Sequence, residues 1–132
     1  MQVKIQNQNI LITGATGGIG RSIVKSFDED NNNLLIIGTN ENKLNELSQE
    51  LKSSTKHLAC DFSNYRNINN IITKITEEFD NKIDILINNA GITKDNLTLR
   101  MKEEEWNKVI NLNLTSTFLL SKYVIKNMLK NK

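Results

Sequence analysis

A glycine-rich turn between an apolar strand and an amphipathic helix is the feature that most constrains the fold of this chain. The segment Thr13-Gly14-Ala15-Thr16-Gly17-Gly18-Ile19-Gly20 follows an apolar run at residues 10–12 and leads into apolar residues at helical spacing. The first glycine can adopt a positive φ that a Cβ atom disfavours. Free backbone amides and the positive end of the helix dipole then face an anion. The turn therefore predicts a strand–turn–helix unit that can bind a diphosphate.

The spacing of these glycines is G-x-x-x-G-x-G. It is neither the G-x-G-x-x-G dinucleotide fingerprint nor a P-loop, because no Gly-Lys-Ser/Thr follows. On composition alone, an ordinary tight turn between a strand and a helix is an equally good interpretation. The glycine turn needs support from the rest of the chain.

Composition excludes several classes of protein. Charged residues make up 24% of the 132 residues and hydrophobic residues 38%, which is typical of a soluble globular domain. No apolar run approaches the ~20 residues that cross a bilayer, and the polar segment 1–9 lacks the core of a signal peptide. A net charge of +2 from scattered lysines does not favour nucleic acid. With Cys60 as its single cysteine, the chain is expected in a reducing compartment, the cytoplasm or an organelle matrix or stroma.

Apolar strand candidates alternate with amphipathic segments along the chain. The strands are expected at 10–13, 34–38, 57–60 and 83–88, each buried on both faces. Helices are expected from about Gly18 to Asp28, from the N-cap Asn40, after residues 63–64, and from 102–105 towards the end of the chain, with a break. This alternation predicts an α/β fold with a Rossmann-type parallel sheet, strand order 3-2-1-4, and helices on both faces.

A second motif, Asn88-Asn89-Ala90-Gly91, follows the fourth strand at the sheet edge where ligands bind in open parallel sheets. Together with the glycine turn, it makes the sequence resemble the short-chain dehydrogenase/reductase family over essentially its whole length. Segments 91–97, 99–106 and 109–116, with Ser121-Lys122, are most similar to the bacterial 3-oxoacyl-acyl-carrier-protein reductases. Other short-chain reductases share parts of this pattern.

The resemblance implies a role for a set of residues. Those facing the diphosphate are Gly14, Ala15, Thr16, Gly17 and Ile19, with Gly18 and Gly20 allowing close packing. Those near the adenine are Asp61, through its carboxylate, and Phe62, through its backbone. Those beside the ribose and nicotinamide are Asn88, Ala90 and Gly91, and Asn113 helps to hold a water of the proton relay. The alternatives are a loop or helix-capping acid at Asp61 and a polar helix residue without a catalytic role at Asn113.

The end of the second strand bears on the choice of cofactor. An acid there would bind a ribose 2′-hydroxyl and repel a 2′-phosphate. Gly38, Thr39 and Asn40 carry no acid, and Thr39 matches the position that contacts the 2′-phosphate in the resembled reductases. Against this, Gly17 stands where relatives that prefer NADP often carry a base, and Glu41 is close. The sequence favours NADP(H) over NAD(H).

The family's proton donor is missing from the 132 residues. The resemblance implies a Tyr, a Lys four residues later that lowers its pKa, and a Ser that orients the carbonyl, all after a fifth strand. The tyrosines present, Tyr65 and Tyr123, are interpreted as helix residues, and His57 as a core or edge residue. No cluster of residues has the spacing of a metal site. We therefore expect the chain alone to be inactive.

The resemblance implies that the chain is the cofactor-binding half of an NADP-dependent 3-oxoacyl-acyl-carrier-protein reductase of fatty acid synthesis. Its implied partners are an acyl-carrier-protein-bound 3-ketoacyl substrate and a second copy of the chain, bound through the long last helix. That helix is expected to expose Val109, Leu112, Phe118, Leu119 or their neighbours. The alternatives are a non-catalytic nucleotide- or partner-binding module and a reductase of another ketone or alcohol.

Overall fold

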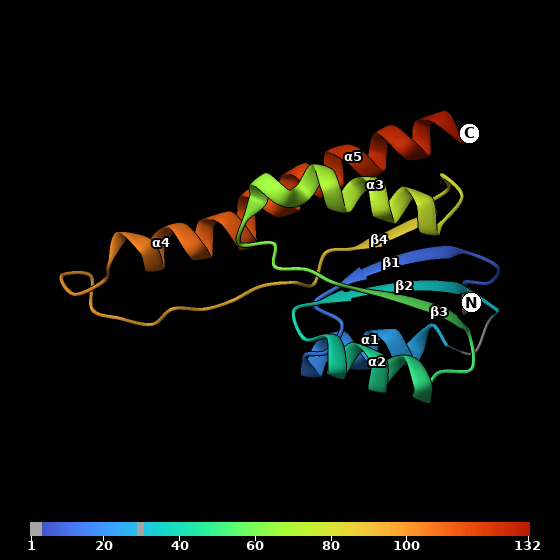
Figure 1. Ribbon diagram of the computed structural model, residues 1–132, viewed down its shortest axis with the longest axis horizontal. Helices are drawn as coiled ribbons and strands as arrows, with labels where there is room; N and C mark the ends of the chain where they lie inside the picture. The colour runs from blue at the N-terminus through green and yellow to red at the C-terminus, as the bar shows by residue number, and fades with distance from the viewer. Residues whose placement is uncertain (1–3, 29–30) are drawn as a thin grey trace.

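The computed structural model describes residues 4–28 and 31–132, and a four-stranded parallel sheet forms its centre. The strands are β1 (Asn9–Thr13), β2 (Asn33–Gly38), β3 (Ser54–Ala59) and β4 (Ile85–Ile87). They lie in the order β3-β2-β1-β4 (Figure 1), which confirms the predicted order 3-2-1-4. All three neighbouring pairs are parallel.

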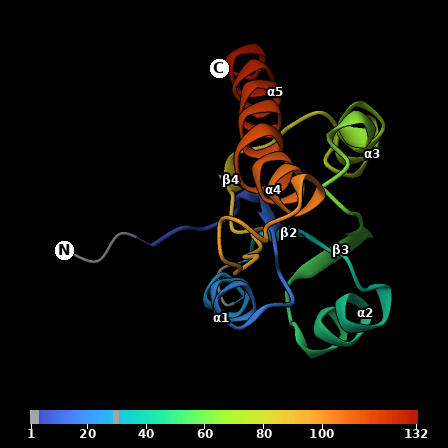
Figure 2. The same ribbon diagram turned by 90° about the vertical axis from the view of Figure 1, so that its left-hand side faces the viewer.

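Helices cover both faces of this sheet. Helices α1 (Gly18–Ser26) and α2 (Glu41–Glu50) lie against one face, and α3 (Ile68–Glu78) and α5 (Ser116–Lys130) lie against the other (Figures 1 and 2). A short 3₁₀ turn, η1 (Tyr65–Asn67), leads into α3. Helix α4 (Glu103–Ile110) joins α5 through a π-helical turn, η2 (Asn111–Thr115). The structure confirms the predicted long helix with a break.

Successive residues of the central strands belong to opposite faces, because the side-chain period of a strand is two. Leu11 of β1 and Leu35 of β2 pack beneath α3 and α5. Ile10 and Ile12 of β1 pack against α1 and α2. The two apolar layers are thus separated by the sheet, and β1 and β2 are buried on both sides, as predicted.

The outer strands differ from the prediction. Residues of β3 are exposed or half-buried, and β4 is half-buried throughout, so neither strand is buried on both faces. The reason is position, because β3 and β4 are the edges of the sheet and each pairs with one neighbour in the described part of the chain. Strand β3 also starts earlier than predicted, at the polar residue Ser54, since an edge strand tolerates polar side chains.

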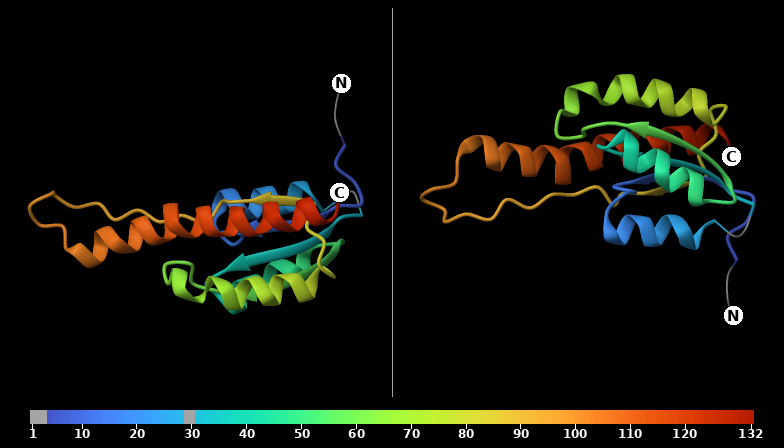
Figure 3. Two further views of the ribbon diagram at one scale, coloured as in Figure 1. Left: turned by 90° about the horizontal axis from the view of Figure 1, so that it is seen from above. Right: turned by 60° about the horizontal axis from the view of Figure 1, so that its bottom comes forward.

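Two helix ends follow from local sequence. The side chain of Asn40 accepts a hydrogen bond from the backbone amide of Lys43 at 3.0 Å, which confirms Asn40 as the N-cap of α2. Three acids, Glu103, Glu104 and Glu105, occupy the first turn of α4, where they complement the helix dipole. Helix α4 and the loop before it extend beyond the carboxyl edge of the sheet (Figures 1 and 3).

The long last helix exposes a different set of apolar residues from the predicted one. Leu112 is buried, and Val109 and Leu119 are half-buried, so the prediction is wrong for Leu112. Phe118 is exposed, as predicted, together with Leu114, Ile125 and Leu129. In the part of the chain that the structure describes, no helix has the length and apolar character required to cross a bilayer.

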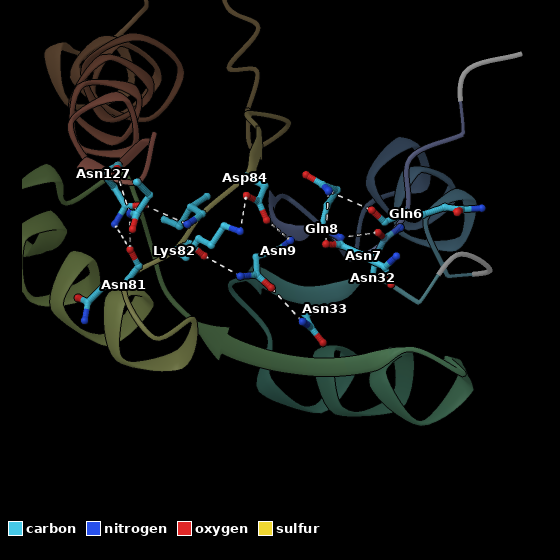
Figure 4. Close-up of polar contacts among 12 residues, drawn as sticks. Gln6, Asn7, Gln8, Asn9, Asn32, Asn33, Asn81, Lys82, Asp84 and Asn127 are labelled. Atoms are coloured by element: carbon cyan, nitrogen blue, oxygen red, sulfur yellow. Dashed lines mark hydrogen bonds and ion pairs between the residues drawn. The ribbon is translucent and has the colours of Figure 1, made fainter. Parts of the chain in front are cut away.

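Asparagine side chains fix the amino ends of the strands (Figure 4). Nδ2 of Asn9 donates to the carbonyl oxygen of Lys82 at 2.9 Å, and its Oδ1 accepts from Nδ2 of Asn33 at 2.9 Å. From α5, Oδ1 of Asn127 accepts from the backbone amide of Ile83 at 3.0 Å. These contacts hold the segment before β4 against both β1 and α5, at the edge opposite the glycine turn.

Candidate functional site

A pocket of about 380 Å³ opens at the carboxyl edge of the sheet, where the glycine turn, the end of β2 and the loop after β4 meet. Its size is that of a small-molecule site. The lining residues are Gly14, Thr16, Gly17, Gly18, Ile19, Gly20, Ile37, Gly38, Thr39, Cys60, Phe62, Asn89, Ala90, Gly91, Ile92 and Leu112. The two sequence motifs therefore form walls of one pocket.

The glycine turn requires glycine at its first position. Gly14 has φ +62°, in the left-handed region that side chains disfavour. A Cβ atom there would also lie 2.9 Å from the backbone of Ala90. Both constraints place Gly14 directly against the loop after β4.

Gly20 is required by packing. A Cβ atom at Gly20 would overlap with the carbonyl oxygen of Gly14 and would lie 2.7 Å from Nδ2 of Asn89. Gly18 is different, because a Cβ atom there meets no atom within 4 Å. The prediction of close packing is thus confirmed for Gly20 and wrong for Gly18, which faces open space at the mouth of the pocket.

The amino end of α1 presents unpaired amides to the pocket. Its N-cap is Gly17, which has no side chain to cap the helix, and its first turn contains no acid. Within the described residues, no acceptor is recorded for the amides of Gly18, Ile19 and Gly20. These amides and the helix dipole form a site for an anion at a wall of the pocket.

Thr13 joins the two motifs. Its Oγ1 accepts hydrogen bonds from the backbone amides of Asn89 at 3.1 Å and Ala90 at 3.0 Å. Nδ2 of Asn89 in turn donates to the carbonyl oxygen of Gly14 at 3.0 Å. The loop after β4 is therefore fixed to the loop after β1.

Asn113 holds a residue that lines the pocket. It lies in the π-helical turn η2, and its side chain donates to the carbonyl oxygen of Ile92 and accepts from the amide of Ile92, both at 2.9 Å. Gly91 lies beside it, since a Cβ atom at Gly91 would be 3.5 Å from Oδ1 of Asn113. The side chain thus holds the loop that borders the pocket.

The end of β2 forms another wall. Gly38 is buried, and a Cβ atom there would lie 3.3 Å from Oγ1 of Thr16, so the glycine turn packs closely over β2. Thr39 follows, exposed at the pocket mouth. Among the described residues, no carboxylate lines this wall.

Cys60, Asp61 and Phe62 follow β3. Burial, followed by the nearby Asp61 carboxylate, raises the pKa of the Cys60 thiol to about 11. Hydrogen bonds from the hydroxyl and the backbone amide of Ser63 hold the pKa of the Asp61 carboxyl below its usual value, so Asp61 is ionised at neutral pH. Phe62 is buried in the core beneath α3 and α5 and also reaches the pocket.

The structure brings most of the predicted cofactor residues to the pocket. Those that line it are Gly14, Thr16, Gly17, Ile19, Thr39, Phe62, Ala90 and Gly91. Three others lie outside the lining: Ala15 is buried, Asp61 contacts Ser63, and Asn88 donates from Nδ2 to Oγ of Ser121 at 2.9 Å. Their contacts with a nucleotide, like the relay role of Asn113, stay predictions.

Sequence reasoning missed several lining residues. Asn89 and Ile92 flank predicted residues of the loop after β4, so the Asn-Asn-Ala-Gly motif was a signal for them. Cys60 precedes Asp61 at the end of β3, but as a single cysteine it indicated only a reducing compartment. Leu112 reaches the pocket from η2, and only the three-dimensional fold could show this.

Tyr123 does not line the pocket. It is a residue of α5, as predicted, where it packs against the apolar layer beneath α3, and burial raises its pKa. Lys126 shares with it a separate hollow between α5 and the end of α3. Neither residue lines the pocket at the glycine turn.

A second hollow, of about 450 Å³, lies at the amino edge of the sheet. Its charged residues are Lys56, Glu78, Asp80 and Lys82. Lys56 pairs with Glu78 at 3.1 Å, and Lys82 with Asp84 at 3.7 Å. Both lysines there are paired with carboxylates, whereas the pocket at the carboxyl edge has free amides facing it.

Comparisons with known proteins agree on one family. The family model for short chain dehydrogenases matches residues 8–132. The chain is 38% identical over 130 residues to a 3-oxoacyl-acyl-carrier-protein reductase of Rickettsia bellii, which covers 98% of this chain and 52% of that protein. It is 42% identical over 122 residues to the enzyme of the same name from Escherichia coli, which covers 92% and 50%. The chain thus spans about half the length of these curated relatives.

A solved structure matches in the same way. The structure of a 4-hydroxyisoleucine dehydrogenase complexed with NADH superimposes with a TM-score of 0.85 at 32% sequence identity. The match covers 95% of this chain and 51% of that one. Sequence and fold comparisons therefore each match about half the length of longer relatives.

Proposed function

The chain belongs to the short-chain dehydrogenase family, and on that premise we propose that it binds NADP(H) and forms the nucleotide-binding half of a 3-oxoacyl-acyl-carrier-protein reductase. The observation that carries the proposal is the pocket that Gly14 and Ala90 both line, with the amino end of α1 at its wall. Its residues fit a dinucleotide, because the open space beside Gly18 and the free amides of α1 suit a diphosphate.

The protein's part in binding can be assigned wall by wall. The amides of Gly18 and Ile19 donate to the diphosphate, and Thr39 contacts the 2′-phosphate at the end of β2. Ala90 and Gly91 border the nicotinamide ribose. When bound, NADPH supplies the hydride that reduces a 3-keto group.

Asn113 has two roles in this proposal. Its side chain fixes Ile92, which lines the pocket, and it helps to hold a water of the proton relay. A π-turn is a frequent device at functional sites, because it widens the helix and redirects a side chain. The substrate carried by acyl carrier protein and the location of the chain in the cytoplasm rest on the reductases that it resembles.

Titration of the chain with NADPH and NADH tests the proposal. Wild type should bind NADPH more tightly. Thr39→Asp should reverse the order, because a carboxylate there repels the 2′-phosphate and accepts from a 2′-hydroxyl. Equal affinities of both nucleotides in both proteins would refute the NADP assignment, and the absence of binding to wild type would refute nucleotide binding.

The same preparation tests the proposed lack of turnover. A 3-ketoacyl thioester and NADPH should show no nucleotide consumption with these 132 residues, since Tyr123 and Lys126 lie outside the pocket. General acid catalysis is worth about 10² to 10⁴-fold, and its loss leaves little rate to detect. Turnover that Tyr123→Phe abolishes would show that the proton donor has been misplaced.

A further inference from the structure

An acid stands close to the cofactor-selecting end of β2. Gly38, Thr39 and Asn40 are uncharged, but Glu41 follows as the first residue of α2. A carboxylate in this region favours a ribose 2′-hydroxyl and repels a 2′-phosphate. Thr39 lines the pocket, whereas Glu41 is absent from its lining. Its carboxylate is directed elsewhere.

The Glu41 carboxylate contacts the side chain of His57. Nε2 of His57 lies 2.8 Å from Oε1 of Glu41. An ionised carboxylate can only accept, so Nε2 carries the hydrogen and Nδ1 of a neutral ring accepts from the hydroxyl of Ser48 at 3.2 Å. Glu41 and Ser48 are seven residues apart, on one face of α2, and the imidazole bridges them from the edge strand β3.

The two side chains differ in freedom. The His57 side chain is 21% exposed and is bonded on both ring nitrogens, whereas the Glu41 side chain is 63% exposed. Without its imidazole partner, Glu41 would have the freedom of a surface side chain two residues from Thr39. The contact with His57 therefore decides where this carboxylate lies.

We propose that His57 is a specificity-determining residue that favours NADP(H) by holding the Glu41 carboxylate away from the 2′-phosphate position beside Thr39. The inference rests on the proposed function, because it concerns the nucleotide that this pocket binds. His57 does not line the pocket, so it acts as a positioning residue. NADH has a hydroxyl in place of the phosphate, which a carboxylate does not repel, so loss of the contact should not weaken NADH binding.

The test measures Kd for NADPH and NADH by fluorescence titration at one pH and ionic strength. His57→Phe keeps a planar ring and removes the donor, and it should weaken NADPH about three- to tenfold without weakening NADH, as expected for an exposed carboxylate near a phosphate. His57→Gln keeps an N–H donor and should preserve the wild-type ratio. Glu41→Gln in the His57→Phe background should restore NADPH binding.

Lys56→Gln is the matched control. Lys56 adjoins His57 on β3 and pairs with Glu78 at the amino edge, so this variant frees a carboxylate far from the pocket. It should leave the ratio of the two Kd values unchanged. Thermal melting followed by circular dichroism reports whether each variant folds.

The outcomes distinguish a failure of the proposed His57 role from a failure of the proposed nucleotide binding. If wild type binds both nucleotides and a folded His57→Phe keeps their ratio, His57 has no such role. If wild type binds neither, the proposed function fails first. If His57→Phe does not fold, the single variant Glu41→Gln tests the proposal. A change below about twofold in the ratio of the two Kd values supports a carboxylate that His57 already holds away from the phosphate. A gain in NADPH affinity above about tenfold overturns the proposal.

Discussion

The side-chain amide of Asn113 satisfies both backbone polar groups of Ile92. Its Nδ2 donates to the carbonyl oxygen and its Oδ1 accepts from the amide, each at 2.9 Å. The two residues lie 21 positions apart, on η2 and on the loop after β4. This pair connects the long last helix to the mouth of the pocket.

Asn113→Ala should release this loop. Each hydrogen bond contributes about 1 kcal/mol to stability, so the variant should lose on the order of 1 to 2 kcal/mol in urea unfolding. The amide of Ile92 should exchange its hydrogen faster. Asn113→Asp keeps the acceptor for that amide and should protect it, although the donor to the carbonyl is lost. Equal exchange rates in wild type and Asn113→Ala would show that the pair does not hold the loop.

Gly20→Ala should destabilise the chain and abolish nucleotide binding. Its Cβ atom would overlap with the carbonyl oxygen of Gly14, and forcing atoms into a packed site costs about 1 to 3 kcal/mol. Gly18→Ala is the matched control, because its Cβ atom faces open space in the same turn of α1. It should keep or slightly raise the melting temperature, since alanine is a better helix former. Similar melting of the two variants would contradict the packing described for Gly20.

Cys60 should react with iodoacetamide as a thiol of high pKa. Burial, aided by the Asp61 carboxylate, raises its pKa to about 11. The rate should therefore rise about tenfold per pH unit from pH 7 to 10, whereas an ordinary thiol levels off above about 8.5. In urea the ordinary profile should return. NADPH should slow the reaction, because Cys60 lines the pocket. A plateau near pH 8.5 in the folded chain would be inconsistent with the buried thiol.

Asp28 should make stability depend on pH in the acid range. Burial raises its pKa, but hydrogen bonds from Ser53 and Lys52 outweigh this and leave the pKa below the usual value. A lowered folded pKa contributes stability above the unfolded pKa of about 3.9, and this is lost as pH falls through the folded value. The difference in free energy of unfolding between wild type and Asp28→Asn should be constant from pH 7 to 5 and should disappear as the pH falls below about 4. A difference that persists to pH 2 would exclude this linkage.

The exposed apolar face of the last helix should drive self-association. Leu114, Phe118, Ile125 and Leu129 are each more than half exposed and recur at helical spacing. Sedimentation should show a concentration-dependent dimer that Phe118→Glu weakens at least about tenfold, because a buried charge is costly. Asn69→Glu adds the same charge at an exposed position of α3 and should leave the association unchanged. A monomeric wild type at high concentration would rule out this face as an interface.

Local sequence patterns predicted the fold, because together they are compatible with one arrangement of strands and helices. Apolar runs alternating with amphipathic segments fix a parallel sheet with crossovers, and the glycine turn and Asn40 mark the ends of two elements. The beginning of β3 was missed, since Ser54 is polar and an edge strand has no hydrophobic pattern to reveal it.

The burial of Leu112 could not be predicted from helical spacing. A π-turn carries an additional residue per turn and so rotates the following face of the helix. This shift directs Leu112 into the core, and leaves Phe118 and Leu114 outside. The same turn brings Asn113 to Ile92, a contact over 21 residues that local sequence does not encode.

Thr13 and Asn89 meet across 76 residues of chain, and this separation has a consequence for synthesis. A ribosome adds about 5 to 20 residues per second, so the glycine turn emerges roughly 4 to 15 s before the segment that completes the pocket. During that interval β2 is available to pair with one edge of β1, but β4, which pairs with the other edge of β1, has not yet been synthesised. The pocket is complete only in chains elongated past the Asn-Asn-Ala-Gly motif, so the proposed nucleotide would favour chains in which β4 has paired with β1.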